Sequence, residues 1–437
     1  MPRLLIHAAL VAQAFACLTG CAAQTSLADT QSAAVAENSP ASAFSQERLR
    51  RIDRMLQQYV DEGRIAGAVA LVLERRRPVY ERAVGWGDRE GGVRMTNDTI
   101  FRIASQTKAI TSVATLILLE EGKLTLRDPV SKFIPAYAAT TVAVQRNAGV
   151  DIVPAKRAIT IRDLLTHTSG ASYGTQPYIA ELYRAKGLGP AAGAGWYIAD
   201  KDEPVCTTME RLASLPFIAQ PGEAYVYGYS TDILGCVVER AAGVSLDEFI
   251  RTRITQPLKM DDTHFYLPKD QRSRLATVYG SGADGEAVRS AEGALGQGHY
   301  IEGPRRSFSG GAGLVSTARD YGRFLEMIRN DGELEGVRIL APRTVALMRT
   351  NQVGDLHSKD GLGFGLGFQT VERYGANGME APGAFGWGGA YGSLYRVDPT
   401  AGVVVLLMLQ LMPDNTDVRE KFTNLVYQAM LAETFVP

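Results

Sequence analysis

Cysteine and histidine are scarce in this chain, and the few present form no metal-ligand pattern. The 437 residues include four cysteines and five histidines, and none shows the close Cys/His spacing of a metal site. An excess of charge of one sign is also missing, because 46 basic residues nearly balance 47 acidic ones. This balance gives no indication of a nucleic-acid or polybasic-lipid partner, and we expect neither a metal nor an organic cofactor.

No apolar run is long enough to span a bilayer, and the N-terminal run is typical of export. Leu4 to Phe15 follows Arg3 and is too short for a membrane helix. Leu18-Thr19-Gly20-Cys21 resembles the bacterial lipobox, whose cysteine is lipidated. We therefore predict a signal peptide over residues 1–20, a lipid anchor on Cys21 and a place in the bacterial cell envelope or periplasm. Ordinary cleavage near Ala22-Ala23 is the alternative.

The composition changes after this segment. Residues 21–44 are rich in Ala and Ser, which predicts a flexible tether carrying the anchor. Residues 45–437 are predicted to form the folded domain, long enough for a full core and two subdomains. Its two cysteines, Cys206 and Cys236, would lie where disulfides persist. Nothing in the sequence fixes their separation, so their pairing stays open.

Strand patterns occur at both ends of this domain. Residues 68–73 and 79–84 predict a hairpin, and residues 365–371, 383–397 and 402–410 predict later strands that join the same sheet. Helices are predicted from Ser45 to about Glu62 and over Val418 to Leu431. A helical insertion is expected at about 125–305. The predicted fold class is therefore α/β of the α+β type, with an antiparallel sheet from both chain ends, flanking helices and an inserted, mostly helical subdomain.

The most informative stretch is the apolar segment from Phe101 to Gly122, which we interpret as a buried helix. Its first turn carries Lys108, a cation placed against the helix dipole. Residues three apart share a helix face, so the amine is expected to reach the Ser105 hydroxyl. A serine activated by an amine is a known kind of nucleophile. The alternative is an N-capping Ser105 beside a surface Lys108.

Two other serine arrangements compete with this pair. A catalytic triad would need a histidine, and the available ones are His167, His264, His299 and His357, none with a convincing Asp partner. Gly170-Ala171-Ser172-Tyr173-Gly174 fits the Gly-x-Ser-x-Gly elbow. The elbow requires a strand before the serine and a helix after it, whereas residues 160–167 predict a capped helix. Both alternatives are disfavoured.

Two further stretches are candidates for the same site. Pro221 to Gly235 places Tyr227 and Tyr229 in a turn before an apolar helix. A tyrosine ordinarily titrates near 10, so it acts as a base only where a cation such as Lys108 stabilises the phenolate. Gly383 to Ser393 is a strand crowded with glycines around Trp387, which indicates close approach of a ligand or another backbone. Taken singly, each stretch is better explained by ordinary packing, with tyrosines that point one hydrogen bond outward and a strand against a tight neighbour.

Together these pieces resemble the serine β-lactamase and penicillin-binding-protein superfamily, closest to its class C β-lactamase-like carboxylesterases. Ser105-Gln106-Thr107-Lys108 is similar to the Ser-x-x-Lys motif, Tyr227 begins the tyrosine motif, and Trp387-Gly388-Gly389 occupies the third box, usually Lys-Thr-Gly. The resemblance spans about residues 50–430. It implies Ser105 as nucleophile, Lys108 and Tyr227 as the proton-transfer pair, and the N–H groups of Ser105 and Ala390 as the oxyanion hole.

Two departures from the family pattern sharpen the expected substrate. Tyr229 stands where β-lactamases favour Asn, and Trp387 replaces the third-box lysine. Loss of that cation disfavours an anionic β-lactam or peptide carboxylate. We therefore expect a serine hydrolase of small esters or amides, with Trp387, Gly388, Gly389 and Tyr229 contacting the substrate. A β-lactamase or D-amino-acid peptidase and a non-catalytic envelope binding protein are the alternatives, and the sequence indicates no oligomeric state.

Overall fold

The computed structural model describes residues 42–147, 149–189, 198, 201–291, 300–301 and 303–431. The chain divides into two units, Met1–Ser42 and Ala43–Pro437, and every described helix and strand lies in the second. The predicted signal peptide, Cys21 and nearly all of the tether lie outside the described residues, as does His299. Within the described ranges, no helix is long and apolar enough to cross a membrane.

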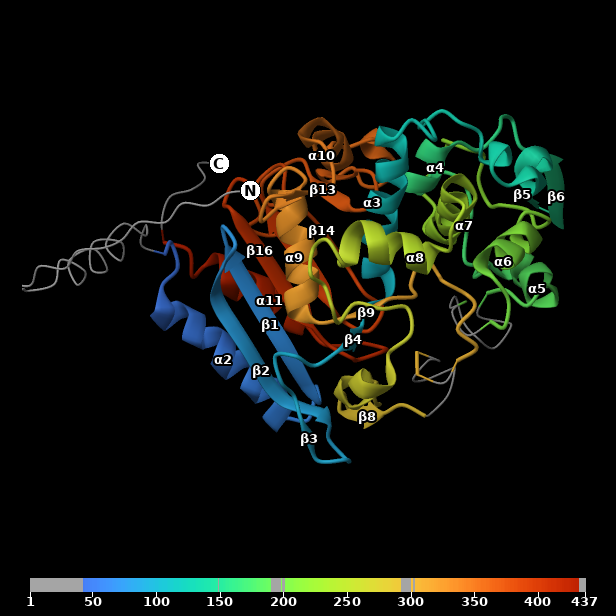
Figure 1. Cartoon of the computed structure of the whole chain (residues 1–437). Coiled ribbons are helices and arrows are strands. Elements are labelled where there is room, and N and C mark those ends of the chain that lie inside the picture. Colours follow the sequence, from blue (N-terminus) through green and yellow to red (C-terminus); the bar gives the residue numbers. More distant parts are fainter. Residues whose placement is uncertain are drawn as a thin grey trace, which may run out of the picture. The chain divides into compact units, whose positions relative to one another are not determined.

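The main structural element is an eight-stranded antiparallel sheet with the order β12-β13-β14-β15-β16-β1-β2-β3 (Figure 1). Its strands, in chain order, are β1 Gly67–Glu74, β2 Arg77–Asp88, β3 Val93–Arg94, β12 Leu362–Phe364, β13 Gln369–Val371, β14 Phe385–Gly388, β15 Leu394–Asp398 and β16 Val403–Met408. Val69 of β1 lies opposite Met408 of β16. The two chain ends therefore build one sheet, as the strand patterns predict.

Helices cover both faces of this sheet. The α-helices of the described residues are α2 Gln46–Asp61, α3 Thr107–Glu120, α4 Ile161–Leu165, α5 Pro177–Ala185, α6 Val205–Leu212, α7 Ser230–Ala242, α8 Leu246–Ile250, α9 Ala318–Arg329, α10 Pro342–Arg349 and α11 Val418–Tyr427, and those that pack on the large sheet include α2 and α11 on one face and α3 and α9 on the other. Alternate side chains of β1 point to opposite faces. Leu71 packs in the cluster with α3 and α9, whereas Ala70 packs with α2 and α11 (Figure 1). Burial on both faces explains why β1 is apolar from Ala68 to Leu73.

The middle of the chain contains helices α4 to α8 and also short hairpins. Outside the large sheet the strands are β4 Phe101–Arg102, β5 Thr141–Arg146, β6 Gly149–Pro154, β7 Tyr279–Ser281, β8 Ala287–Arg289, β9 Val315–Ser316, β10 Glu333–Leu334 and β11 Val337–Arg338, paired as β4-β9, β5-β6, β7-β8 and β10-β11. Of these pairs, β5-β6 and β7-β8 are the hairpins of the middle region. The apolar side chains of α4, α6 and α7 belong to the same buried cluster as those of α3. A disulfide joins Cys206 of α6 to Cys236 of α7.

Three predicted boundaries were wrong. The helix expected from Phe101 begins at Thr107, because Phe101–Arg102 pairs with β9 and a 3₁₀ turn, η1 Ala104–Gln106, follows. The 383–397 stretch is two strands, separated by a turn in which the Gly392 N–H donates to the Gly389 carbonyl at 3.1 Å. The last helix ends at Tyr427 rather than Leu431. By contrast, Ser45 caps α2 as predicted, its hydroxyl accepting from the Arg48 N–H.

Candidate active site

The site begins where η1 passes into α3. Ser105 lies in the 3₁₀ turn and Lys108 in the first turn of the buried helix. The Lys108 ammonium donates to Ser105 Oγ at 3.3 Å, to the Tyr173 hydroxyl at 3.0 Å and to the Gly311 carbonyl at 2.8 Å. Only 1% of the lysine is exposed. The structure therefore brings the serine and the amine together, and Ser105 is not the N-cap of α3, which is Gln106.

A buried carboxylate on α7 supports this lysine from behind. Asp232 accepts from the Ser309 hydroxyl at 2.6 Å and from the Gly311 N–H at 3.0 Å, and the Gly311 carbonyl in turn accepts from Lys108. Burial raises the pKa of Asp232, and the positive charge of Lys108 opposes that shift. A Cβ on Gly311 would lie 2.4 Å from Asp232 Oδ2, so only glycine fits there.

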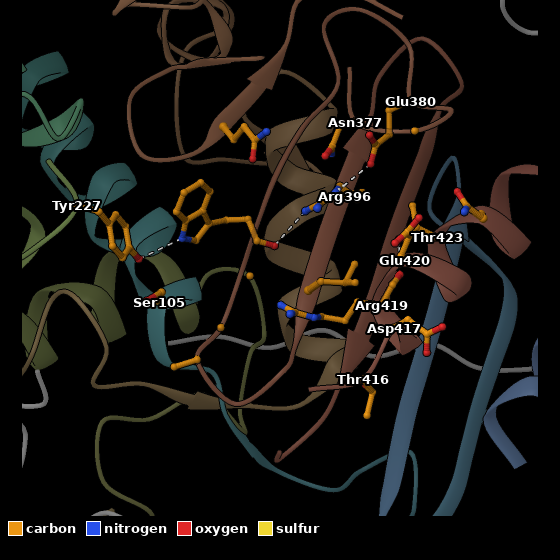
Figure 2. Close-up of a pocket in the computed structure, with 18 of the residues that line it drawn as sticks. Ser105, Tyr227, Asn377, Glu380, Arg396, Thr416, Asp417, Arg419, Glu420 and Thr423 are labelled. Carbon is orange, nitrogen blue, oxygen red and sulfur yellow. Dashed lines mark hydrogen bonds and ion pairs between the residues drawn. The ribbon is translucent and has the colours of Figure 1, made fainter. Parts of the chain in front are cut away.

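Tyr227 lies near Ser105 (Figure 2). Its hydroxyl accepts a hydrogen bond from the Trp387 indole Nε1 at 3.1 Å, the dashed line at Tyr227 in Figure 2. The Lys108 ammonium lies 4.7 Å from the centroid of the Tyr227 ring. An indole N–H can only donate, so it stabilises negative charge that develops on the tyrosine oxygen. Trp387 thus supplies a donor to Tyr227 although it replaces a lysine.

The glycine-rich third stretch lies directly against the serine turn. A Cβ on Gly389 would lie 2.7 Å from the Ile103 carbonyl oxygen, so the absence of a side chain permits this approach. Ala104, the residue before Ser105, has φ of 42°, a left-handed conformation that is strained for a non-glycine residue. The close backbone approach inferred from the sequence is therefore real, and the neighbour is the turn that carries Ser105.

An open cavity of about 1090 Å³ contains most of the candidate residues. Ser105, Tyr227, Trp387, Gly388, Gly389 and Ala390 all line it. The position of Tyr229 differs from the expectation that it contacts substrate. Its side chain is fully buried and its hydroxyl accepts from the Gly189 N–H at 3.1 Å, so it packs behind the cavity wall.

Comparison with known proteins assigns these motifs to one family. The family model described as Beta-lactamase matches residues 52–430. The chain belongs to the beta-lactamase family. Esterase EstB of Burkholderia gladioli is 35% identical to it over 375 residues, which cover 82% of this chain and 89% of that protein.

Solved structures agree with this assignment. EstCE1, described as a hydrolase with promiscuous acyltransferase activity, has a TM-score of 0.74 and 30% identity and covers 88% of this chain and 99% of its own. Simvastatin synthase (LovD) from Aspergillus terreus, unliganded, has a TM-score of 0.74 and 26% identity, covering 89% and 99%. The superfamily resemblance and the fold class are thereby confirmed. This beta-lactamase-family chain is a serine hydrolase.

Neither competing serine arrangement gains support in this beta-lactamase-family structure. Among the described residues, no histidine makes a hydrogen bond to Ser105. His167 instead packs its ring 4.7 Å from that of Tyr227, and burial holds its pKa well below the ordinary value. Ser172 is 1% exposed, donates to Gln176 Oε1 at 2.9 Å and accepts from the Gly174 N–H. It stabilises a loop and does not open onto the cavity.

Sequence reasoning missed the residues that complete the polar contacts. Tyr173 lies in the rejected Gly-x-Ser-x-Gly pentapeptide, where only the serine was considered, yet it accepts from Lys108 and lines the cavity. Burial raises its pKa well above the ordinary value, so the hydroxyl stays protonated. Asp232 lies within the tyrosine motif and was not singled out. Asp232 lies five positions after Tyr227, in the helix that leads away from the site, and this spacing was the available signal. Nothing in the sequence connected Tyr173 with Lys108.

An arginine on β15 supports the strand of Trp387. Arg396 Nη1 donates to the Trp387 carbonyl at 3.3 Å, and its Nε lies 2.9 Å from Glu380 Oε1 (Figure 2). Arg396 is paired with Gly386 across the ladder, and a Cβ at Gly386 would lie 2.9 Å from the arginine side chain. Burial outweighs the arginine and raises the pKa of Glu380 to about 7. No regular spacing in the sequence predicts that Arg396 pairs with Glu380 and lies opposite Gly386.

Proposed function

We propose that this serine hydrolase cleaves small carboxylic esters through an acyl-enzyme on Ser105, with amides as slower substrates. The observation that carries the proposal is the hydrogen bond from Lys108 to Ser105 Oγ, 3.3 Å long, at a cavity that Tyr227 also lines. The names of EstB and EstCE1, an esterase and a hydrolase, support the same chemistry.

In the acylation step, Ser105 Oγ attacks the ester carbonyl carbon and its proton passes to the Lys108 and Tyr227 pair, which enters the step one proton short, with either the amine or the phenol deprotonated. The new Oγ–C bond gives a tetrahedral oxyanion, stabilised by the backbone N–H groups of Ser105 and Ala390. The carbon–oxygen bond to the alcohol then breaks, and the stored proton goes to the departing oxygen. Trp387 assists by donating to Tyr227 whenever the tyrosine oxygen carries negative charge.

Deacylation repeats the sequence with water as the nucleophile. Water attacks the acyl carbon, its proton goes to the same Lys108 and Tyr227 pair, and the proton returns to Ser105 Oγ as the acid leaves. Tyr173 and the Gly311 carbonyl hold the Lys108 nitrogen in place through both halves. No cofactor enters these steps.

A β-lactamase or D-amino-acid peptidase of the same fold is the alternative function. Such substrates carry a carboxylate, and the third box offers an indole where a lysine would bind it. The arginines that line the cavity already have acidic partners, Arg396 with Glu380 and Arg419 with Asp414. A neutral ester therefore fits this site better than an anion.

Labelling with a fluorophosphonate, followed by peptide mass spectrometry, tests the mechanism. We expect the adduct on Ser105, and an adduct on Ser172 in its place would contradict the proposal. Parallel assays with a chromogenic ester and a chromogenic cephalosporin test the substrate class. Faster turnover of the cephalosporin would favour the alternative, and no turnover together with no adduct would indicate a binding protein.

We also propose export and lipid anchoring through Cys21 after removal of residues 1–20. The support is the order of Arg3, the apolar run and Leu18-Thr19-Gly20-Cys21. Expression in a bacterium with labelled palmitate checks it, because the wild-type chain should take up label and Cys21→Ser should not. An unlabelled wild-type chain shortened near Ala23 would indicate ordinary signal cleavage.

A further inference from the structure

The cavity continues well beyond Ser105 and changes character as it does so. Around Ser105 its wall is aromatic, formed by Tyr173, Tyr227 and Trp387. The far wall comes from β13, the loop before β14, β15 and the start of α11, and it is polar (Figure 2). Its residues include Gln369, Asn377, Glu380, Arg396, Arg419 and Asn424. A volume of about 1090 Å³ is more than a small acyl group needs and matches the upper range of ligand pockets.

The charges on this far wall are largely neutralised by protein partners. Arg396 pairs with Glu380 at 2.9 Å, and Arg419 pairs with Asp414, whose side chain is 4% exposed, at 3.1 Å. A substrate carboxylate could pair with Arg396 or Arg419 only if Glu380 or Asp414 lost its own partner. Leaving a buried acid unpaired in this way is unfavourable. Glu420 alone among the charged lining residues has no ion-pair partner in the described part of the chain, and it is exposed to solvent.

Two amide side chains on this wall are unused by the protein. Gln369 of β13 and Asn424 of α11 are half-buried and line the cavity. Within the described residues, neither side-chain amide makes a hydrogen bond to another group. Each offers one acceptor and two donors. A hydroxyl group both donates and accepts, so a neutral group with several hydroxyls matches these amides better than an alkyl chain, an anion or an ammonium.

We propose that the far wall binds the alcohol portion of the ester and that this portion carries several hydroxyl groups, as a sugar or another polyol does. The acyl group then lies against the aromatic wall beside Ser105. This inference rests on the proposed ester hydrolysis, and it names the substrate class for the same cavity.

The test compares butanoyl esters of four alcohols with the full chain: the 6-hydroxyl of glucose, cyclohexylmethanol, choline and glycolic acid. We expect kcat/KM for the glucose ester to exceed that for the cyclohexylmethyl ester, which matches it in ring size, by about tenfold or more. Gln369→Leu and Asn424→Leu should each lower that ratio about five- to tenfold, the effect of losing one or two hydrogen bonds. The ratio is insensitive to a loss of folded protein, since both esters are affected equally.

Gln145→Leu is the matched control, because this exposed glutamine of β5 does not line the cavity and should leave the ratio unchanged. A ratio near one, or a ratio that neither cavity variant lowers, would overturn the inference while ester hydrolysis stands. Preference for the choline or glycolate ester would likewise overturn it, by assigning the wall to a cation or an anion. Turnover of no ester, with no fluorophosphonate adduct, would reject the proposed function and this inference with it.

Discussion

Lys108 and Arg396 are two largely buried cations, one over the ring of Tyr227 and the other against the carbonyl of Trp387, and they are held in different ways. Lys108 contacts only neutral oxygens, those of Ser105, Tyr173 and Gly311. In the described structure no carboxylate lies within ion-pair distance of it. Arg396 is paired directly with the buried Glu380 and donates to backbone carbonyls.

This difference suggests different uses. A lysine among neutral acceptors can give up and regain a proton without leaving a partner carboxylate unpaired, which suits proton transfer. An arginine does not lose its proton in proteins, and a guanidinium fixed by a carboxylate acts as a support. Arg396 supports the carbonyl of Trp387, whose indole contacts Tyr227.

The largest expected effect comes from exchanging each cation for methionine. Lys108→Met should lower kcat for ester hydrolysis by about 10³-fold or more, because proton transfer to and from Ser105 is lost. Arg396→Met should lower kcat by less than about tenfold but reduce the free energy of unfolding by about 3 kcal/mol, since it leaves Glu380 buried without its partner. Single-turnover kinetics and thermal unfolding measure the two effects. If Lys108→Met and Arg396→Met lowered kcat equally, the two cations would not differ in function as described.

The second-largest loss of kcat is expected when the indole N–H of Trp387 is removed. Trp387→Phe keeps an aromatic ring but removes the donor to Tyr227, and we expect kcat to fall about ten- to a hundredfold, as for a hydrogen bond to a developing charge. Trp86→Phe on β2 is the control, because that tryptophan lies outside the cavity. Unchanged kinetics in the first variant would mean that Tyr227 does not depend on Trp387.

Tyr173 tests how tightly the lysine must be held. Tyr173→Phe removes one of the three acceptors of the Lys108 ammonium, and we expect a loss of about five- to tenfold in kcat with little change in KM. Steady-state kinetics with a small ester measure it. A rise in KM at constant kcat would instead assign Tyr173 to substrate binding.

The smallest effect on activity is expected at Glu380, where stability should depend on pH. Burial raises its pKa from 4.5 to about 7, so the folded state holds this proton more tightly than the unfolded chain. The resulting stability is present below about pH 4.5 and is lost as pH rises through 7. Relative to Glu380→Gln, the wild type should lose about 2 to 3 kcal/mol of unfolding free energy between pH 5 and pH 8. Denaturant titrations at both pH values would show a constant difference if Glu380 ionises normally.

Periodicity and capping predict much of the fold, since α2, the β1-β2 hairpin and the late strands have patterns set by local burial. The start of α3 was misplaced because β4 depends on β9, more than 200 residues further along the chain. The local sequence around Phe101 cannot predict a pairing with a strand so far along the chain.

The candidate site was predictable to the extent that its residues lie in short motifs. Ser105, Lys108, Tyr227 and Trp387 are brought together as expected, whereas Tyr229 packs in the core. The support from Asp232 and from the Glu380–Arg396 pair depends on contacts between separate segments. Only the glycines at 311 and 386 hint at those contacts, and a glycine alone does not say which side chain it makes room for.

The pairing of β1 with β16 has a consequence for when the protein becomes competent during its synthesis. Ser105 leaves the ribosome before Val403–Met408, the strand that lies beside β1, and Asn424 of the cavity wall follows that strand. A growing chain that has emerged only as far as the middle region has a nucleophile and a lysine without the Trp387 strand or the far wall. The cavity is therefore complete only after the residues up to Asn424 have been synthesised, so the nucleophile and its lysine precede most of the cavity that surrounds them.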